Sequence, residues 1–173
     1  MKELDLCLGG KSWYRFCERE LDTGFEAYAK KVFERDNNTC RYCGFSSSVG
    51  MSVVNADHDY LNNQLSNLLT VCPFCLQCRF IEAVGTLLGG GGQMVYLPEV
   101  SQAQLNALCH VLYASIVNGS QHARLSDSII QSIKLRSSVV EEKYGTHMSD
   151  PAFMGQMLID TPVHDLENRR KLI

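Results

Sequence analysis

The chain has 173 residues, of which 45% are hydrophobic, a content typical of a globular protein and too high for a disordered one. A formal net charge of −3 argues against a protein whose main partner is a nucleic-acid backbone. The apolar runs are too short to cross a bilayer and the N-terminus carries acids, so we expect neither a membrane span nor a signal peptide. The eight cysteines then favour metal binding in a reducing cytoplasm over disulfides.

The first part of the chain predicts a short strand, a helix and a hairpin. Leucines alternate with other residues over 4–8, which predicts a strand. Apolar residues recur at helical spacing over 25–35, so we expect an amphipathic helix there. Residues 51–54 are predicted to form a strand, and Ser66 is placed to cap a helix that starts at Asn67.

The second part of the chain predicts a helical lobe. Four glycines at 89–92 mark a boundary, and residues 94–97 after it have the composition of a strand. Residues 101–104 form a capping-box signature at the start of a helix with one apolar stripe. A second helix is expected from about 127 to 144, and a third begins at Pro151, which follows an aspartate cap.

Two cysteine pairs carry the strongest chemical signal in the chain. Cys40 and Cys43 are separated by two residues, as are Cys72 and Cys75, and two such knuckles can close a tetrahedral four-sulfur shell around zinc. The alternative is that some of these thiols are merely buried small hydrophobes. Two correctly spaced pairs favour one structural Zn²⁺. Such a site adds about 10–16 kcal/mol of apparent binding free energy at neutral pH, which exceeds the net stability of many domains.

The remaining cysteines leave one choice open. Cys78 lies three positions after Cys75 and could face the same way on a helix, so it either replaces a ligand or packs beside the shell. We favour packing. Cys7, Cys17 and Cys109 have no partner at ligand spacing and are also expected to be packed.

Four stretches resemble the His-Asn-His (HNH) endonuclease motif with its zinc knuckles: residues 39–45, 55–58, 66–68 and 71–75. The resemblance implies a ββα core in which a hairpin and a helix hold one catalytic divalent ion. It would make Asp57 a ligand of that ion, His58 the general base and Asn67 the clamp of the hairpin loop.

The same region departs from the motif in ways that oppose cleavage. The third ligand position is Leu76, which has no lone pair to give, and Arg79 nearby would repel a cation. The segment from Cys43 to Cys78 contains no lysine or arginine that could hold a phosphate backbone. We therefore predict a pseudo-endonuclease with vestigial site residues and no enzymatic activity. The alternatives are an HNH-type metal-dependent DNA endonuclease that uses Asp57 and His58, and a zinc module that binds DNA without cleaving it.

Further strings, more specific than the knuckles, extend along the whole chain: residues 10–13, 31–36, 65–68, 96–99, 105–112, 139–145 and 149–151. They are similar to the IcmJ/DotN family of Dot/Icm type IVB secretion systems. The resemblance implies a subunit of the coupling-protein complex that helps to deliver effector proteins at the cytoplasmic face of the inner membrane. Its implied partners are the coupling ATPase DotL, bound through its C-terminal extension, with DotM and the IcmS/IcmW adaptors in the same assembly. No nucleic acid is expected, and membrane association would come only through these partners.

Together these observations predict an α+β fold in one domain, residues 1–173. Its parts would be an HNH-like zinc core at 25–83, a strand plus helical lobe at 93–165 and a tail at 166–173.

The sequence offers several candidate contact residues for a protein partner. Leu87 and Leu88 are candidates, and so is the predicted strand at 94–97 if it has a free edge that a peptide can extend. Trp13, the single tryptophan, is expected in the core, with an aromatic anchor as the alternative. The basic residues at 169–171 are interpreted as a solvated tail, with attraction to anionic lipid as the alternative.

Overall fold

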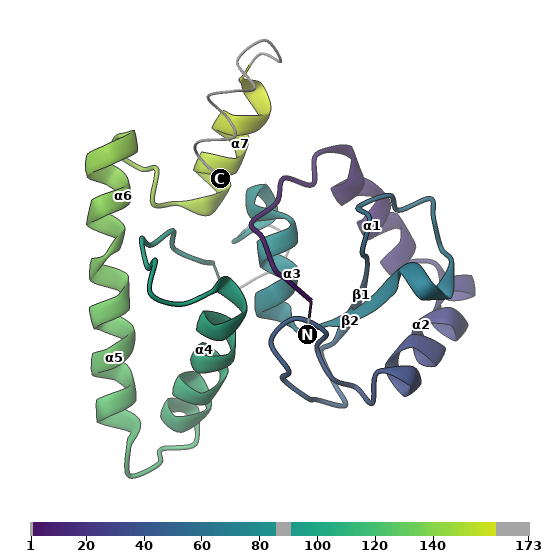
Figure 1. Cartoon of the computed structure of the whole chain (residues 1–173), viewed down its shortest axis with the longest axis horizontal. Helices are drawn as coiled ribbons and strands as arrows, with labels where there is room; N and C mark the ends of the chain where they lie inside the picture. The colour runs from purple at the N-terminus through teal and green to yellow at the C-terminus, as the bar shows by residue number, and fades with distance from the viewer. Residues whose placement is uncertain (1, 86–90, 162–173) are drawn as a thin grey trace.

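The computed structural model describes residues 2–85 and 91–161 and combines helices with one small sheet (Figure 1). The elements in chain order are α1 (Lys11–Glu20), α2 (Thr23–Arg35), β1 (Ser52–Asn55), the 3₁₀ turn η1 (Leu65–Asn67), β2 (Leu68–Val71), α3 (Pro73–Arg79), the 3₁₀ turn η2 (Ile81–Ala83), α4 (Gln102–Val117), α5 (Ala123–Leu135), α6 (Ser137–Tyr144) and α7 (Pro151–Asp160). This mixture confirms the α+β class. The sheet lies with α1 and α2 on one side of Figure 1, and α4, α5 and α6 form the other side.

The sheet is a pair of antiparallel strands, and its two faces pack in two different hydrophobic clusters. Ser52 pairs with Val71 and Asn55 with Leu68, so the register is fixed along the whole hairpin. Because side chains alternate along a strand, Val53 and Leu68 face α2 and join its Val32 in one cluster. The neighbours on the other face join the cluster that holds the cysteines. The strand predicted at 51–54 is thus confirmed, displaced by one residue.

An aromatic cluster, to which α1 contributes, fills the space beside the cysteines. Trp13 and Phe16 of α1 each lie 5.1 Å, ring centre to ring centre, from Phe80. Both side chains are buried, which confirms Trp13 as a core residue, whereas Tyr14 between them is exposed. The helix itself was not predicted, although the spacing of its buried residues is helical.

The expected helix starts are confirmed where capping residues define them. At α4 the Ser101 hydroxyl accepts the backbone N–H of Gln104 at 3.3 Å, and the Gln104 side chain accepts the Ser101 N–H at 2.8 Å. At α7 an Asp150 oxygen accepts the N–H of Ala152 at 2.9 Å. Such caps satisfy backbone donors that have no partner within the helix. None of the described helices has the length and apolarity that crossing a bilayer requires.

Residues 4–8 were predicted to form a strand, and that prediction is wrong. Within the described chain this segment crosses α3 with isolated hydrogen bonds, from Cys7 N to Cys78 O at 2.8 Å and from Ile81 N to Cys7 O at 3.2 Å. Its alternating leucines are explained by burial against two clusters, because Leu4 belongs to the cysteine core and Leu8 packs beside η2. The alternating leucines therefore indicate an extended segment that packs on the core, and not a strand of a sheet.

Residues 94–97 were also predicted as a strand and form none. Met94 N donates to Ser149 O at 2.8 Å, but no ladder follows, and Tyr96 is 57% exposed. The proposed free strand edge for a peptide is therefore absent from this described segment. The Leu87 and Leu88 candidates and the tail at 166–173 lie outside the described residues.

Two helix predictions need correction. Asn67 does not start a helix: it ends η1, and the next four residues form β2 because pairing with β1 buries all of them. The helix expected over 127–144 is two helices that meet at Arg136, whose backbone carbonyl is contacted by Tyr96 N at 3.4 Å. The Arg136 guanidinium pairs with Glu99 at 2.7 Å. These contacts come from a distant segment, so the sequence of the helix alone did not predict the break.

Candidate metal centre

The first cysteine pair lies in a tight turn between α2 and β1. Cys40 N donates to Phe45 O at 2.8 Å, and Gly44 N returns a hydrogen bond to Cys40 O at 3.0 Å. Gly44 has a φ of 78°, a left-handed conformation that glycine adopts without steric cost. The turn brings the thiols of Cys40 and Cys43 to the same side.

The second pair lies where β2 passes into α3. Cys72 is the residue before the helix, Pro73 occupies its first position, and Cys75 follows within the first turn. A hydrogen bond from Arg41 N to Thr70 O at 2.9 Å ties the first knuckle to β2. The sheet and this bond therefore bring two pairs together that are far apart in sequence.

The structure brings the four thiols together in metal-binding geometry. The sulfur atoms of Cys40, Cys43, Cys72 and Cys75 all lie within 4.8 Å of one another. The Cys43 and Cys72 sulfurs are 3.5 Å apart. A tetrahedral shell with zinc–sulfur bonds of about 2.3 Å has an edge of about 3.8 Å, so the arrangement fits such an ion with small adjustments. All four residues are buried, and Cys43 is the most exposed at 8%.

Each thiol of the cluster shifts the pKa values of the others. Hydrogen bonds from Cys43 and the other two thiols lower the pKa of Cys40, whereas the bonds with Cys40 raise the pKa values of Cys72 and Cys75. Four thiolates in a buried cluster repel each other, so full deprotonation needs a cation at the centre. The arrangement is therefore suited to a metal ion and unsuited to four thiolates without one.

Cys78 packs beside the group and is not one of its members. Its thiol donates to the Phe74 carbonyl at 3.3 Å, and burial raises its pKa to about 11. A protonated thiol is a poor metal ligand. The structure thus favours packing over replacement of a ligand.

The HNH-like residues lie on the loop that joins β1 to β2. Both oxygens of Asp57 accept side-chain amides, from Asn67 at 2.8 Å and from Asn62 at 2.7 Å. These bonds, that of Asn67 first, hold the pKa of the Asp57 carboxyl below its usual range. Asn67 also accepts the Asp57 N–H at 3.2 Å and donates to Asn62 O at 2.9 Å, so it closes the loop.

His58 occupies a position where a cation would be opposed. Its Nε2 lies 3.8 Å from the Cys7 sulfur, and its carbonyl accepts the Ser12 hydroxyl at 3.1 Å. Burial lowers the pKa of His58, and the positive charge of Arg79 lowers it further, against the opposite effect of Asp57. Arg79 is itself buried and donates to the Asn55 carbonyl at 2.7 Å. A divalent ion beside this imidazole would meet a fixed positive charge.

Two further residues hold this loop and were missed in the sequence. The Asn55 amide donates to the carbonyls of Asp59 and Asn62, both at 2.8 Å. The Arg19 guanidinium donates to the Asn55 side chain and, at 2.5 Å, to Val53 O. Arg19 is also stacked between the Phe25 ring, 4.3 Å away, and the Tyr60 ring, 4.8 Å away. Arg19 is flanked in sequence by Glu18 and Glu20, so the local sequence resembled an exposed charged stretch and gave no signal of this role.

The helix α4 adds two polar side chains that the sequence did not single out. Asn106 and His110 point their nitrogens at sulfurs of the cluster, from 3.3 Å and 3.1 Å respectively. They are four residues apart and therefore lie on one face of α4. Their spacing was the available signal, and it does not distinguish a donor to sulfur from an ordinary polar residue of a helix.

The fold and this site define an α+β protein with a buried four-cysteine metal-binding cluster. No protein-family model matches the chain. The chain is 47% identical over 170 residues to the Type 4 apparatus protein DotN of Legionella pneumophila subsp. pneumophila, strain Philadelphia 1. The match covers 98% of this chain and 79% of that protein. The chain therefore belongs to the IcmJ/DotN family, as its sequence strings predicted.

Proposed function

We propose that this chain is a non-catalytic subunit of a type IVB secretion apparatus and that one structural Zn²⁺ stabilises it. The similarity to a type 4 apparatus protein over nearly the whole chain carries this proposal. In the apparatus the chain binds the coupling ATPase DotL through that protein's C-terminal extension, in an assembly with DotM and the IcmS/IcmW adaptors. It helps to deliver effector proteins there, at the cytoplasmic face of the inner membrane, and reaches the membrane only through these partners.

The metal proposal is supported by the donor set and by its burial. Four soft sulfur donors within 4.8 Å of one another suit zinc better than hard cations such as Mg²⁺. When bound, the ion would cross-link the turn at Cys40 and Cys43 to the β2–α3 junction at Cys72 and Cys75. A set of four protein ligands leaves no open position for substrate, which is typical of a structural site and not of a catalytic one.

The absence of catalysis is proposed from the loop between β1 and β2. We propose that residues 25–83 form an HNH-like ββα core, and the order β1–β2–α3, with Asp57 and His58 after the first strand, supports this. Leu76 supplies no ligand, Arg79 opposes a cation, and the N-terminal segment places Cys7 against His58. A phosphate approaching the imidazole from the Cys7 side would have to displace part of the chain itself. We accordingly regard Asp57, His58 and Asn67 as vestigial.

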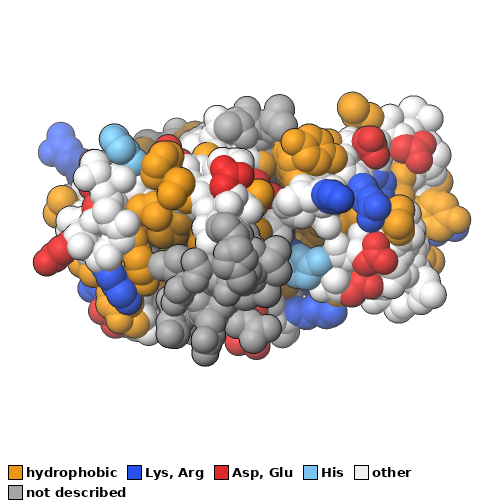
Figure 2. Space-filling model, turned by 90° about the horizontal axis from the view of Figure 1, so that it is seen from above, with side chains coloured by type: hydrophobic (Ala, Val, Ile, Leu, Met, Phe, Trp, Pro, Cys, Tyr) orange, Lys and Arg blue, Asp and Glu red, His pale blue; other side chains and the backbone are white. Residues whose placement is uncertain are grey.

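The surface is suited to a protein partner better than to nucleic acid. Several apolar residues of α4 and α5 are strongly exposed, among them Val111, Val117, Leu125 and Leu135. Exposed apolar groups are where protein partners dock. On the face seen in Figure 2, hydrophobic side chains are exposed on both sides of the molecule, and charges of both signs are interspersed instead of forming a basic stripe. We propose that the helical part, within one domain, carries the contact with the coupling complex.

The test is complementation together with co-purification. The full chain is expressed with a tag in a L. pneumophila strain that lacks DotN, and effector delivery into host cells is measured. We expect delivery to be restored and the coupling ATPase to co-purify with the chain. A stable chain that restores nothing and brings down no apparatus subunit would overturn the proposal. The matched control is the Cys40→Ser/Cys72→Ser chain, which should fail in both assays.

A further inference from the structure

The helix α4 covers the cysteine cluster directly. Its Ala103 and Ala107 pack against the hydrophobic cluster that contains the four candidate ligands. Between them Asn106 is 5% exposed, although an asparagine has four hydrogen-bonding positions to satisfy. A buried amide on a packing face needs partners, and here its partners are sulfur atoms.

The two side chains aim N–H donors at the second cysteine knuckle. Asn106 Nδ2 lies 3.3 Å from Cys75 Sγ and 3.5 Å from Cys78 Sγ. His110 Nε2 lies 3.1 Å from Cys72 Sγ. A metal-bound thiolate can only accept, so the Nε2 of a neutral His110 would carry the proton.

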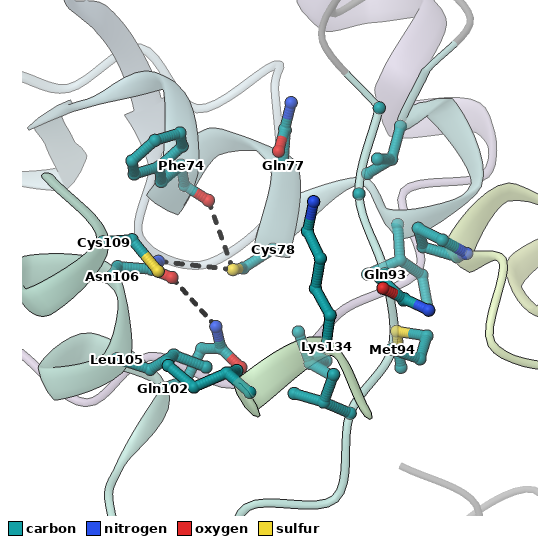
Figure 3. A pocket seen from close by; sticks show the side chains of 18 of the residues that line it. Phe74, Gln77, Cys78, Gln93, Met94, Gln102, Leu105, Asn106, Cys109 and Lys134 are labelled. Atoms are coloured by element: carbon teal, nitrogen blue, oxygen red, sulfur yellow. Dashed lines mark hydrogen bonds between the residues drawn. The ribbon is translucent and has the colours of Figure 1, made fainter. Parts of the chain in front are cut away.

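Neighbouring groups fix the orientation of both donors. Gln102 Nε2 donates to Asn106 Oδ1 at 2.9 Å, which leaves Nδ2 directed at the sulfurs. Figure 3 shows this chain from Gln102 through Asn106 to Cys78, at the wall of a cavity of about 220 Å³. The His110 ring stacks on Phe45, with ring centres 3.7 Å apart, and contacts the Phe74 ring at 4.4 Å. Both donors are therefore held in position by groups other than the sulfurs.

The two knuckles obtain their hydrogen bonds from different sources. The backbone N–H of Cys43 helps to lower the pKa of Cys40, and that of Phe45 helps to lower the pKa of Cys43, so the first knuckle is stabilised by its own turn. The second knuckle is served by side chains of α4, from a segment about 30 residues or more away in sequence. The interaction thus connects the cysteine cluster to the helical part of the molecule.

We propose that Asn106 and His110 are positioning residues of the metal centre and that metal loading holds α4 on the cysteine cluster through them. The inference rests on the proposed zinc site. A divalent ion with four thiolates carries a net charge of −2 in a buried place, and N–H donors stabilise that charge. Neutral thiols in the metal-free chain are much weaker acceptors. Loss of the metal should therefore loosen α4 and, with it, the adjoining surface of α5.

The test compares metal release and metal spectra in single variants. Asn106→Leu and His110→Phe keep the side-chain size, and the phenyl ring can keep the stacking on Phe45. The control is His122→Phe, because His122 is exposed and far from the cluster in sequence. Purified chains are loaded with Zn²⁺ for release to a chromogenic chelator, and with Co²⁺ for its thiolate charge-transfer absorption.

We expect both variants to release zinc about 10–100-fold faster than the wild type, with shifted Co²⁺ charge-transfer bands, and the control to match the wild type. In zinc-loaded protein, hydrogen exchange should also be faster in α4 of both variants than in α4 of the wild type, while exchange in α2 stays equally slow in all three chains. Unchanged release, spectra and exchange in zinc-loaded protein would overturn the inference and leave the zinc site intact. A wild-type chain that binds no metal would instead overturn the zinc proposal, and the inference with it.

Discussion

Removal of two ligands, one from each knuckle, is the sharpest perturbation of the proposed zinc site. In the Cys40→Ser/Cys72→Ser chain each knuckle keeps only one thiol, Cys43 or Cys75. The two replaced residues are almost completely buried, so their hydroxyls would lie among sulfur and apolar atoms. The change removes the cross-link between the turn after α2 and the β2–α3 junction while it alters the volume very little.

The expected loss in the free energy of unfolding follows from the contribution that a structural zinc makes to it. Structural zinc contributes about 10–16 kcal/mol of apparent binding free energy at pH 7, whereas a domain has a net stability of about 5–15 kcal/mol. Even a loss of about 5 kcal/mol would lower the melting temperature by about 10–20 °C in a chain of this size. We therefore expect a chain that is largely unfolded or strongly destabilised at 37 °C.

The assay is thermal unfolding followed by circular dichroism, with zinc content measured on the same samples. The matched control is Cys17→Ser, because Cys17 is a partly buried cysteine outside the cluster. It should shift the free energy of unfolding by less than about 1 kcal/mol. If the double variant melts at the wild-type temperature, or if the wild type contains no stoichiometric metal, the structural role assigned to the cluster is wrong.

Three further outcomes are expected. Arg19→Met should lower the free energy of unfolding by about 2–4 kcal/mol in urea titrations, because it leaves the Val53 carbonyl and the Asn55 side chain without a buried donor; a change below 0.5 kcal/mol, roughly the effect of a surface substitution, would contradict this role. Plasmid incubated with Mg²⁺ or Mn²⁺ should remain unnicked by the wild type and by His58→Ala alike, and nicking that disappears in the variant would refute the pseudo-endonuclease. Burial raises the pKa of Asp36 but hydrogen bonds from Arg35 and Thr70 outweigh it, so the folded pKa is lowered. Its contribution to stability is then present above the unfolded pKa of about 3.9 and is lost as the pH falls through the folded value. Asp36→Ala should flatten the pH dependence of unfolding in that range, and an unchanged profile would count against it.

The sequence predicted those features whose cause is local. The spacing within each cysteine knuckle and the capping residues at Ser101 and Asp150 act over a few positions, so they can be recognised without tertiary information. The break at Arg136 and the strand after Asn67 depend on contacts with distant segments, and sequence periodicity carries no record of them. Local rules also misassigned residues 4–8, where an extended segment alternates because it packs against two clusters.

In the candidate site, too, only the residues with a local sequence pattern could be predicted. The four thiols could be chosen from the sequence, because zinc imposes a spacing. Asn106 and His110 could not, since an asparagine or histidine inside a helix becomes a donor to sulfur only when the helix docks there. The same holds for Arg19, whose partners belong to β1 and to rings of two other segments.

The hydrogen bonds of the β1–β2 loop satisfy its polar groups without an ion. Both carboxylate oxygens of Asp57 accept side-chain amides, one from Asn62 and one from Asn67. Asn55 closes the base of the loop and is itself held by Arg19. With its polar groups satisfied inside the protein, the loop needs no second cation to keep its shape.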